Sequence, residues 1–321
     1  MVRDPVDAVL VDMAFTGVLP VLLGGAPRPP VVVCSLGPLT ISSVDTPPFG
    51  MAWKPEVGID YSLMTSVVHR VIMRSSQRRF NRALRQAKCS PSPVFISDWP
   101  RLADGLLQLS VAGFEYPRSD LPDTVEFVGP VLPDPERDFE PPDWWADLQK
   151  AGTVVHVTQG TFDNTDLDQL IGPTLTALGD RDDLLVIATT GGQPGQQLPS
   201  RIPSNARLAE WVPYSALMRH VDVVITNGGY GGVQYALSHG VPLVVAGETS
   251  DKAEVAARVD HCGVGIDLGT ATPSPEAIRA AVDQVRRDDR YLAAASRLRA
   301  EIDSATPVDA IANVLKRCCD A

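Results

Sequence analysis

The sequence predicts an α/β protein built from two doubly wound, Rossmann-like domains. Three observations support this prediction: short apolar runs alternate with helical segments, the chain has 321 residues, and a proline-rich stretch divides it. Alternating strands and helices are typical of parallel sheets, which bind ligands beyond the carboxyl ends of their strands. A chain of this length is long enough for two domains of ordinary size.

The first half of the sequence contains four apolar runs that predict buried parallel strands. These runs occupy residues 7–12, 31–34, 94–97 and 125–129. Residues 14–23 suit a crossover helix, and residues 38–55 predict a loop because they are rich in proline, glycine and serine. Apolar residues at four-residue spacing predict a helix over residues 61–88.

The predicted helix at residues 61–88 is strongly basic. Its cations are Arg70, Arg74, Arg78, Arg79, Arg82, Arg85 and Lys88. One interpretation is a basic face for peripheral contact with a membrane surface or with an anionic acceptor. The alternative is a solvated helix face, because arginine is also a good helix former.

Residues 130–142 contain five prolines and four acidic residues, which predict a stiff polar connector between domains. The expected organisation is a first domain at residues 1–130, a Pro-rich linker at 131–149, a second domain at 150–302 and a C-terminal helix at 303–321.

The second half alternates regularly between strands and helices. Strands are expected at residues 153–158, 184–188, 206–208, 223–226, 243–245 and 263–267. Helices are expected at residues 165–178, 214–219, 231–239, 252–259, 275–287, 289–302 and 307–317. This pattern predicts a parallel doubly wound sheet with its ligand at the carboxyl ends of the strands.

The composition excludes several functions. A net charge of −11 and a pI of about 4.9 argue against nucleic-acid binding, because no basic excess exists to neutralise phosphates. The five cysteines have no metal-ligand spacing and predict reduced thiols in a cytoplasmic protein. No run of 18 apolar residues occurs, so no membrane span is expected.

A glycine-rich loop follows the predicted strand at 223–226. It runs through Asn227, Gly228, Gly229, Tyr230, Gly231 and Gly232, and a helix is expected to begin near Gly231. Backbone amides at a helix start favour an anion, and glycines let a diphosphate approach the backbone closely. The alternative is an ordinary glycine-rich turn.

Two further segments fit a nucleotide site. Trp211 follows a short strand, and an exposed indole there offers a platform on which a base can stack, although an isolated Trp is more often a core residue. Gly160 and Thr161 follow the first strand of the second domain, where a small-residue loop can touch phosphates; an ordinary strand-to-helix turn is the alternative.

Polar side chains follow the predicted strand at 243–245. Glu248, Asp251 and Lys252 are placed where carboxylates can accept hydrogen bonds from sugar hydroxyls. The alternative is helix capping, with Ser250 or Asp251 at the N-cap and Glu254 in the first turn.

The order and spacing of these motifs resemble the donor signature of the inverting glycosyltransferases in the UDP-glucuronosyltransferase-like superfamily, which have the two-domain GT-B fold. The family pattern has Trp-x-Pro-Gln, then a His-x-Gly-Trp-Asn-Ser-x-x-Glu segment, Gly-Val-Pro and Asp-Gln. Residues in register with it are Trp211, Pro213, Gly229, Gly240, Val241, Pro242 and Asp251. The loop resembles an actinobacterial variant of the signature.

The resemblance implies roles for these residues. Trp211 would stack on the nucleobase, and the backbone of Val212 would bond its edge. Asn227 and the amides of residues 228–232 would hold the diphosphate, while Asp251 and Lys252 would contact the transferred sugar. Three residues depart from the pattern: Asn227 replaces His, Tyr235 replaces the ribose-binding Glu, and Lys252 replaces Gln.

The resemblance also implies a general base in the first domain, a histidine oriented by an aspartate. Asp12 resembles the aspartate, but none of the eleven residues before it is histidine. The histidines of the sequence are His69, His156, His220, His239 and His261, and none fits that position. The first domain is therefore expected to lack its first strands. The alternative role for Asp12 is to cap the following turn.

The predicted function is inverting transfer of a hexose from a UDP- or TDP-type sugar to a hydroxyl of a lipid or natural-product acceptor. The donor is a nucleotide-diphosphate sugar, and the acceptor is expected to be hydrophobic or glycolipid-like. No metal or other cofactor is expected. By resemblance, the C-terminal helix packs back on the first domain. Two alternatives stay open: a nucleotide-sugar-binding remnant without catalysis, and an epimerase of the same fold.

Overall fold

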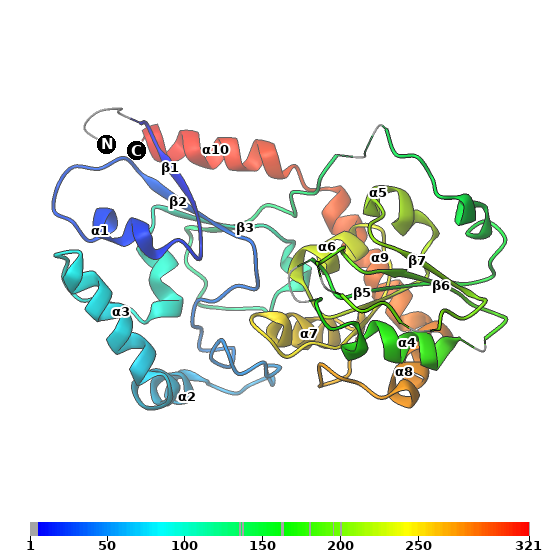
Figure 1. The fold of residues 1–321 in the computed structure, drawn as a ribbon. Coiled ribbons are helices and arrows are strands. Elements are labelled where there is room, and N and C mark those ends of the chain that lie inside the picture. The colour runs from blue at the N-terminus through cyan, green and yellow to red at the C-terminus, as the bar shows by residue number, and fades with distance from the viewer. Residues whose placement is uncertain are drawn as a thin grey trace. The chain divides into compact units, whose positions relative to one another are not determined.

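The computed structural model describes residues 6–134, 136, 138–161, 164–179, 181–194, 196–199 and 201–320. Pro135 and Arg137 of the expected linker lie outside the described residues. The chain forms two compact units (Figure 1). The N-terminal unit comprises Met1–Val131 and Ser304–Ala321, and the C-terminal unit comprises Leu132–Asp303.

The N-terminal unit is built on a four-stranded parallel sheet. In spatial order its strands are β1 (Val9–Asp12), β2 (Val31–Ser35), β3 (Gly105–Gln108) and β4 (Val125–Phe127). Its α-helices are α1 (Leu19–Leu22), α2 (Ser62–Val67), α3 (Arg74–Gln86) and α10 (Pro307–Asp320), and a π-helical turn at Val68–Ile72 joins α2 to α3.

Alternation of side chains along β2 explains how helices cover both faces of this sheet. Val31 and Val33 point to the face that packs against Phe80 and Leu84 of α3. Val32, between them, points to the opposite face, where it packs with residues of α10 including Val314. Residues 304–321 thereby complete the core of the N-terminal unit, with α10 lying along the sheet (Figure 1).

The predicted strand at residues 94–97 is wrong. A 3₁₀ helix at Ile96–Leu102 begins within that range. The side chain of Gln77 accepts a hydrogen bond from the Ile96 amide and donates to the Val94 carbonyl, so α3 uses the backbone groups that a neighbouring strand would need. The strand of this region is β3, which the apolar pattern did not reveal.

The C-terminal unit has a six-stranded parallel sheet in the spatial order β7-β6-β5-β8-β9-β10. Its strands are β5 (Val154–Thr158), β6 (Leu185–Thr189), β7 (Ala206–Ala209), β8 (Val223–Thr226), β9 (Leu243–Val245) and β10 (Gly265–Asp267). This is the order of a doubly wound nucleotide-binding sheet, and its topological switch point lies between β5 and β8.

The helices of this unit follow the expected alternation. They are α4 (Ile171–Leu178), α5 (Tyr214–Leu217), α6 (Tyr230–Ser238), α7 (Lys252–His261), α8 (Pro275–Arg287) and α9 (Asp289–Asp303). Buried residues of α4 and α8 pack with those of β5, β6 and β8 in one core. Within the described ranges, no helix is long and apolar enough to cross a bilayer.

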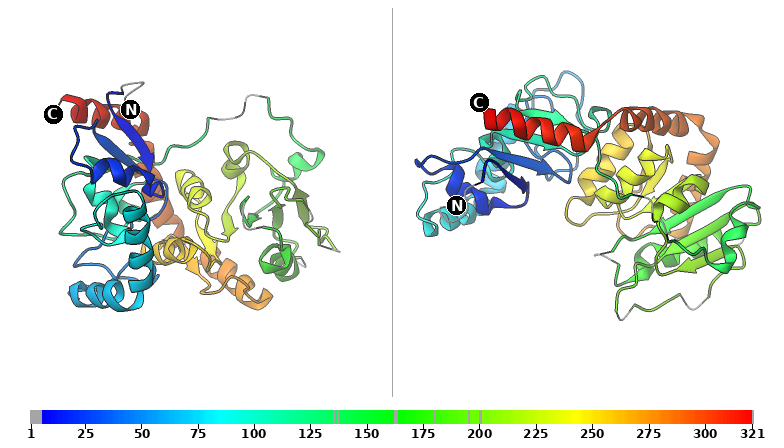
Figure 2. Two further views of the ribbon diagram at one scale, coloured as in Figure 1. Left: turned by 60° about the vertical axis from the view of Figure 1, so that its left-hand side comes forward. Right: turned by 90° about the horizontal axis from the view of Figure 1, so that it is seen from above.

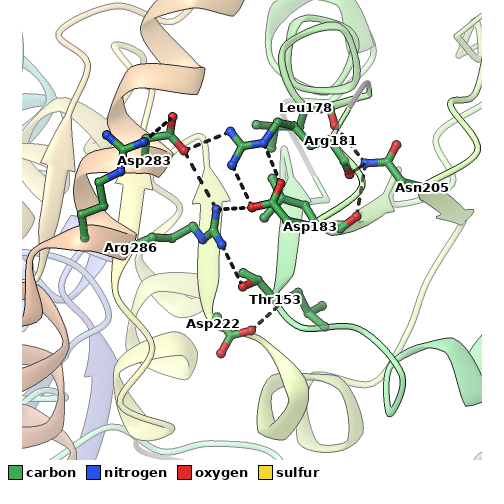
Figure 3. A network of polar contacts seen from close by, with 11 residues as sticks. Thr153, Leu178, Arg181, Asp183, Asn205, Asp222, Asp283 and Arg286 are labelled. Atoms are coloured by element: carbon green, nitrogen blue, oxygen red, sulfur yellow. Dashed lines mark hydrogen bonds and ion pairs between the residues drawn. The ribbon is translucent and has the colours of Figure 1, made fainter.

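An ion-pair network fixes α8 to the amino-terminal edge of the sheet (Figure 3). Arg181 bonds to Asp183 at 2.8 Å and to Asp283 of α8 at 3.0 Å. Arg286 bonds to Asp183 at 2.9 Å and to the Thr153 hydroxyl at 3.1 Å. A cavity of ≈ 680 Å³ opens at this edge, and Arg181, Arg286 and Arg287 beside it are each paired with an aspartate.

Candidate functional site

Four loops follow the carboxyl ends of β5, β6, β8 and β9 and lie along one edge of the C-terminal sheet. They occupy residues 158–161, 189–192, 226–229 and 245–248. Because all strands of the sheet are parallel, this edge also carries the amino ends of the following helices. The residues predicted to bind phosphate and sugar lie on this edge.

Asn227 joins two of these loops at the switch point. Its side chain is 8% exposed, and its amide nitrogen donates to the backbone carbonyl of Gln159 at 2.5 Å. The Gln159 side chain accepts from the amides of Leu170 and Ile171 at the start of α4. Asn227 is therefore a tether that sets the position of the loop after β8 against the loop after β5.

Of the glycines after Asn227, Gly228 is closely packed, whereas the others have open space where a side chain would be. A Cβ on Gly228, whose φ is +84°, would lie 3.0 Å from Val245 and 3.2 Å from the Lys252 carbonyl oxygen. A Cβ on Gly231 would meet nothing within 4 Å, and Cβ atoms on Gly229 and Gly232 would each meet a single atom at 3.8–3.9 Å. The start of α6 therefore faces open space.

An open helix start of this kind suits a diphosphate. The first amides of a helix have no partner within the helix, and the helix dipole adds about 0.3–1 kcal/mol of attraction for a negative charge. Glycine in the first turn of α6 costs helix stability, and no neighbouring protein atom explains Gly231. The predicted ligand Tyr230 has a buried ring, 7% exposed, so its contribution there is its backbone amide.

Trp211 lies on the surface, with 56% of its area exposed, whereas its neighbour Val212 is 2% exposed. The alternative of a core Trp is therefore wrong. Val212 anchors the segment after β7 in the core, and the exposed indole is placed at the same carboxyl edge.

Aromatic rings form a row that runs from β5 past α5 and along α6. The Tyr235 ring lies edge-on to Tyr214 at 5.5 Å and stacks on His239 at 5.6 Å. Tyr214 meets His156 of β5 edge-on at 5.5 Å. His156 is fully buried with its Nε2 3.0 Å from the Thr189 hydroxyl, and burial lowers its pKa to about 3, so the ring is neutral.

The polar cluster after β9 lies at the start of α7. Asp251 occupies the N-cap of α7 but makes no capping hydrogen bond with its side chain, so capping does not explain it. Lys252 Nζ donates to the Thr249 hydroxyl at 3.1 Å. Glu248, Thr249 and Lys252 line a cavity of ≈ 20 Å³, which has room for about one water molecule. A larger ligand must therefore lie over the edge.

The loop after β5 leaves open space beside Gly160. Gly160 has a φ of +73°, and its carbonyl accepts from the buried Asn164 side chain at 2.6 Å. A Cβ on Gly160 would meet only the Asn227 side-chain oxygen, at 3.8 Å. Thr161 is exposed beside it.

The loop after β6 was not predicted as part of the site. Thr190, Gly191 and Gly192 follow β6, and both glycines have positive φ. A Cβ on Gly191 would lie 2.3 Å from Asn164 Nδ2, so this glycine is required for packing. The signal was present in the sequence, because Thr-Thr-Gly-Gly repeats the small-residue pattern of the loop after β5.

In the N-terminal unit, Asp12 ends β1 and accepts a hydrogen bond from the Ala14 amide at 2.7 Å. This is the turn-capping role given above as its alternative. His69 stacks on Phe95 with ring centroids 3.7 Å apart, and burial lowers its pKa. Phe15 and Leu36, which follow β1 and β2 at the carboxyl edge of this sheet, are 57% and 60% exposed.

Comparison with known proteins identifies the family. Residues 173–318 match the erythromycin biosynthesis protein CIII-like, C-terminal domain family. The chain is 39% identical to 4'-demethylrebeccamycin synthase of Lentzea aerocolonigenes over 303 residues, covering 92% of this chain and 70% of that protein. It is 34% identical to UDP-glycosyltransferase 2 of Phaeomoniella chlamydospora over 316 residues, covering 95% and 70%.

The fold has solved counterparts among glycosyltransferases. The glycotransferase of kitacinnamycin superposes with a TM-score of 0.75 at 22% identity, over 98% of this chain and 77% of that one. The prediction of two Rossmann-like parallel sheets is confirmed. Sequence identity and fold agree, and the chain belongs to the UDP-glycosyltransferase family of GT-B glycosyltransferases.

Proposed function

We propose that the protein transfers a hexose from a UDP- or TDP-type sugar to a hydroxyl group of a natural-product or lipid acceptor, with inversion at the sugar carbon. The single observation that carries the donor half of this proposal is the open glycine start of α6 together with an exposed Trp211 after β7, at the same carboxyl edge. Those two features offer a place for a diphosphate and a platform for a base.

The roles of the remaining donor residues follow from their positions. Asn227 keeps the loops after β5 and β8 in register, and the amides of Gly228–Gly232 meet the diphosphate. Glu248, Asp251 and Lys252 contact the hexose, and Gly160 and Thr161 approach the phosphates from the loop after β5. Tyr235 presents its half-buried ring where the ribose would lie.

The acceptor half rests on the N-terminal unit. Phe15 and Leu36 expose apolar surface at the carboxyl edge of its sheet, which suits a hydrophobic acceptor. Asp12 ends β1 at the same edge and is the carboxylate that would orient or replace a base. The relative that is 39% identical is named for rebeccamycin, which supports a natural-product acceptor.

A specific observation favours a second candidate, a protein that binds nucleotide sugar without transferring it. Asp12 bonds to the turn after β1, and His69, the one histidine in the sequence of the N-terminal unit, stacks on Phe95 instead of pairing with Asp12. General-base assistance is typically worth about 10²–10⁴ in rate, so its loss would leave binding intact and turnover very slow.

Calorimetric titration with UDP, TDP and GDP tests the donor site, and sugar-nucleotide hydrolysis in the same samples tests turnover. Binding of one nucleotide with turnover supports the transferase. Binding without turnover favours the second candidate. Failure to bind any of the three nucleotides refutes the nucleotide site and leaves the glycine loop as a structural turn.

A further inference from the structure

We propose that α2, the π-helical turn and α3 form a docking surface for an anionic lipid membrane. This basic–apolar face is defined by two sets of exposed side chains. The apolar set is Leu63, Val67, Val71 and Ile72, and the basic set is Arg70, Arg74, Arg78, Arg82 and Arg85.

The four side chains of the apolar set are largely exposed to solvent. Leu63 is 77% exposed, Val71 69%, Ile72 63% and Val67 45%. Other residues of the same segment already supply its core contacts: Val68, Phe80 and Leu84 are each less than 9% exposed. The segment therefore has one apolar side for the core of the N-terminal unit and a second apolar side that needs a partner outside it.

The basic set follows directly along the chain. Arg74, Arg78, Arg82 and Arg85 are spaced by four, four and three residues, which places them on one stripe of α3. Residues 61–88 contain no aspartate or glutamate. In the part of the chain that the structure describes, none of these arginines is in an ion pair, whereas Arg207, Arg286 and Arg290 of the C-terminal unit all are.

This charge pattern selects an anionic partner. Residues 61–88 carry seven positive charges, so the net charge of −11 leaves −18 on the other residues. Salt screens charges more than about 8–10 Å apart, so a surface that touches this face responds mainly to the arginines. The basic set can therefore attract an anionic surface although the chain as a whole is acidic.

A lipid bilayer fits both sets of side chains. Arginines meet lipid phosphates, and the adjacent valine, leucine and isoleucine side chains enter the boundary between headgroups and acyl chains. The basic–apolar face is also not covered by α10, the helix on the other face of the sheet. Within the N-terminal unit, α3 and α10 pack on opposite faces of the sheet, and Figure 2 shows α2 and α3 on the side away from α10.

The experiment is vesicle flotation with the full chain. We expect binding to phosphatidylcholine vesicles that contain about one third phosphatidylglycerol, and weak binding to pure phosphatidylcholine. Each basic side chain near such a surface raises the constant for binding to it by a factor of about five. The triple variant Arg74→Gln, Arg78→Gln, Arg82→Gln should therefore bind about 100-fold more weakly.

A matched control removes the same charge elsewhere. Arg287→Gln, Arg290→Gln, Arg297→Gln changes three exposed arginines of the C-terminal unit and should bind vesicles like the unchanged protein. The apolar set is tested by Val67→Ser, Val71→Ser, which should reduce the binding that survives at high salt. Calorimetry with UDP should give the same dissociation constant for all these variants, showing that the donor site is intact.

Several outcomes would overturn the proposal. Equal binding to neutral and anionic vesicles would remove the role of the arginines, and equal losses in both triple variants would mean a general charge effect. If the full chain did not float with anionic vesicles, the basic–apolar face would not be a membrane-docking surface and would bind a different partner. If light scattering then showed concentration-dependent self-association that the Arg74, Arg78 and Arg82 changes abolish, that occupant would be a second copy of the chain.

Discussion

Replacing Gly231 with alanine separates ligand contact from fold stability at the start of α6. Gly231 is in the first turn of the helix, is exposed, and has no neighbouring atom within 4 Å of the place where a Cβ would be. Alanine in a helix is more stable than glycine by about 0.5–1 kcal/mol. Gly231→Ala should therefore leave the free energy of unfolding unchanged or raise it.

Nucleotide binding should respond in the opposite direction. If the diphosphate lies against the amides of the first turn, the new methyl group occupies its place and disrupts a charge-assisted hydrogen bond. Such bonds are worth about 1.5–3 kcal/mol, which corresponds to a dissociation constant raised about 10- to 100-fold. Urea unfolding and calorimetric titration with UDP and TDP measure the two effects on the same protein.

Two glycines of the same unit serve as controls. Gly152, before β5 at the far edge of the sheet, also has open space around it, so Gly152→Ala should leave binding unchanged. Gly228→Ala should lower stability, because Gly228 has a φ of +84° and Val245 and Lys252 are close to it. If Gly231→Ala bound nucleotide as well as the unchanged protein, the diphosphate would not be at the start of α6.

Four other predictions follow from the site. Trp211→Ala should weaken nucleotide binding by about 1–3 kcal/mol without loss of stability; an unchanged dissociation constant would contradict base stacking. Lys252→Gln should weaken UDP binding more than uridine binding in calorimetry, and equal losses would move Lys252 away from the charged part of the donor. Burial lowers the pKa of His156 to about 3, against about 6.5 in the unfolded chain, so below about pH 6 the unfolded chain binds a proton that the folded chain does not. The free energy of unfolding should therefore fall by about 1.4 kcal/mol per pH unit as the pH drops below about 6. His156→Gln should remove this slope, and urea titrations at several pH values measure it. A chelator should leave nucleotide binding unchanged, and a strong effect of EDTA would refute the expectation that no metal is needed.

The parallel sheet of the C-terminal unit could be predicted because its strands are apolar runs separated by helical segments. All six of its strands occur where the pattern places them, to within two residues at either end. The strands of the N-terminal unit were harder to predict. β3 has two apolar residues between Gly105 and Gln108 and is buried by its neighbours, whereas residues 94–97 have strand-like composition but bond to Gln77.

The candidate site shows the same division between local and long-range information. The glycine loop, Trp211 and the polar cluster after β9 are local patterns, and the structure places all three at the carboxyl edge of the sheet. The tether from Asn227 to Gln159 links residues 68 positions apart and depends on the parallel pairing of β5 with β8. No local pattern in the sequence contains that pairing, so Asn227 was predicted only as a phosphate ligand.

The tether changes how the negative charge of a donor would be met. An amide at position 227 that donates to Gln159 has less to offer a phosphate than a cationic side chain would. Lys252 is close to this loop, because its carbonyl oxygen lies 3.2 Å and its Cβ 3.5 Å from a Cβ placed on Gly228. In the proposal, the Lys252 ammonium group, which contacts the hexose, would also provide the neighbouring diphosphate with a positive charge that position 227 does not. In the proposed mechanism the leaving diphosphate would be stabilised by the amides of α6 together with Lys252, and Asn227 would act by holding the loops in place.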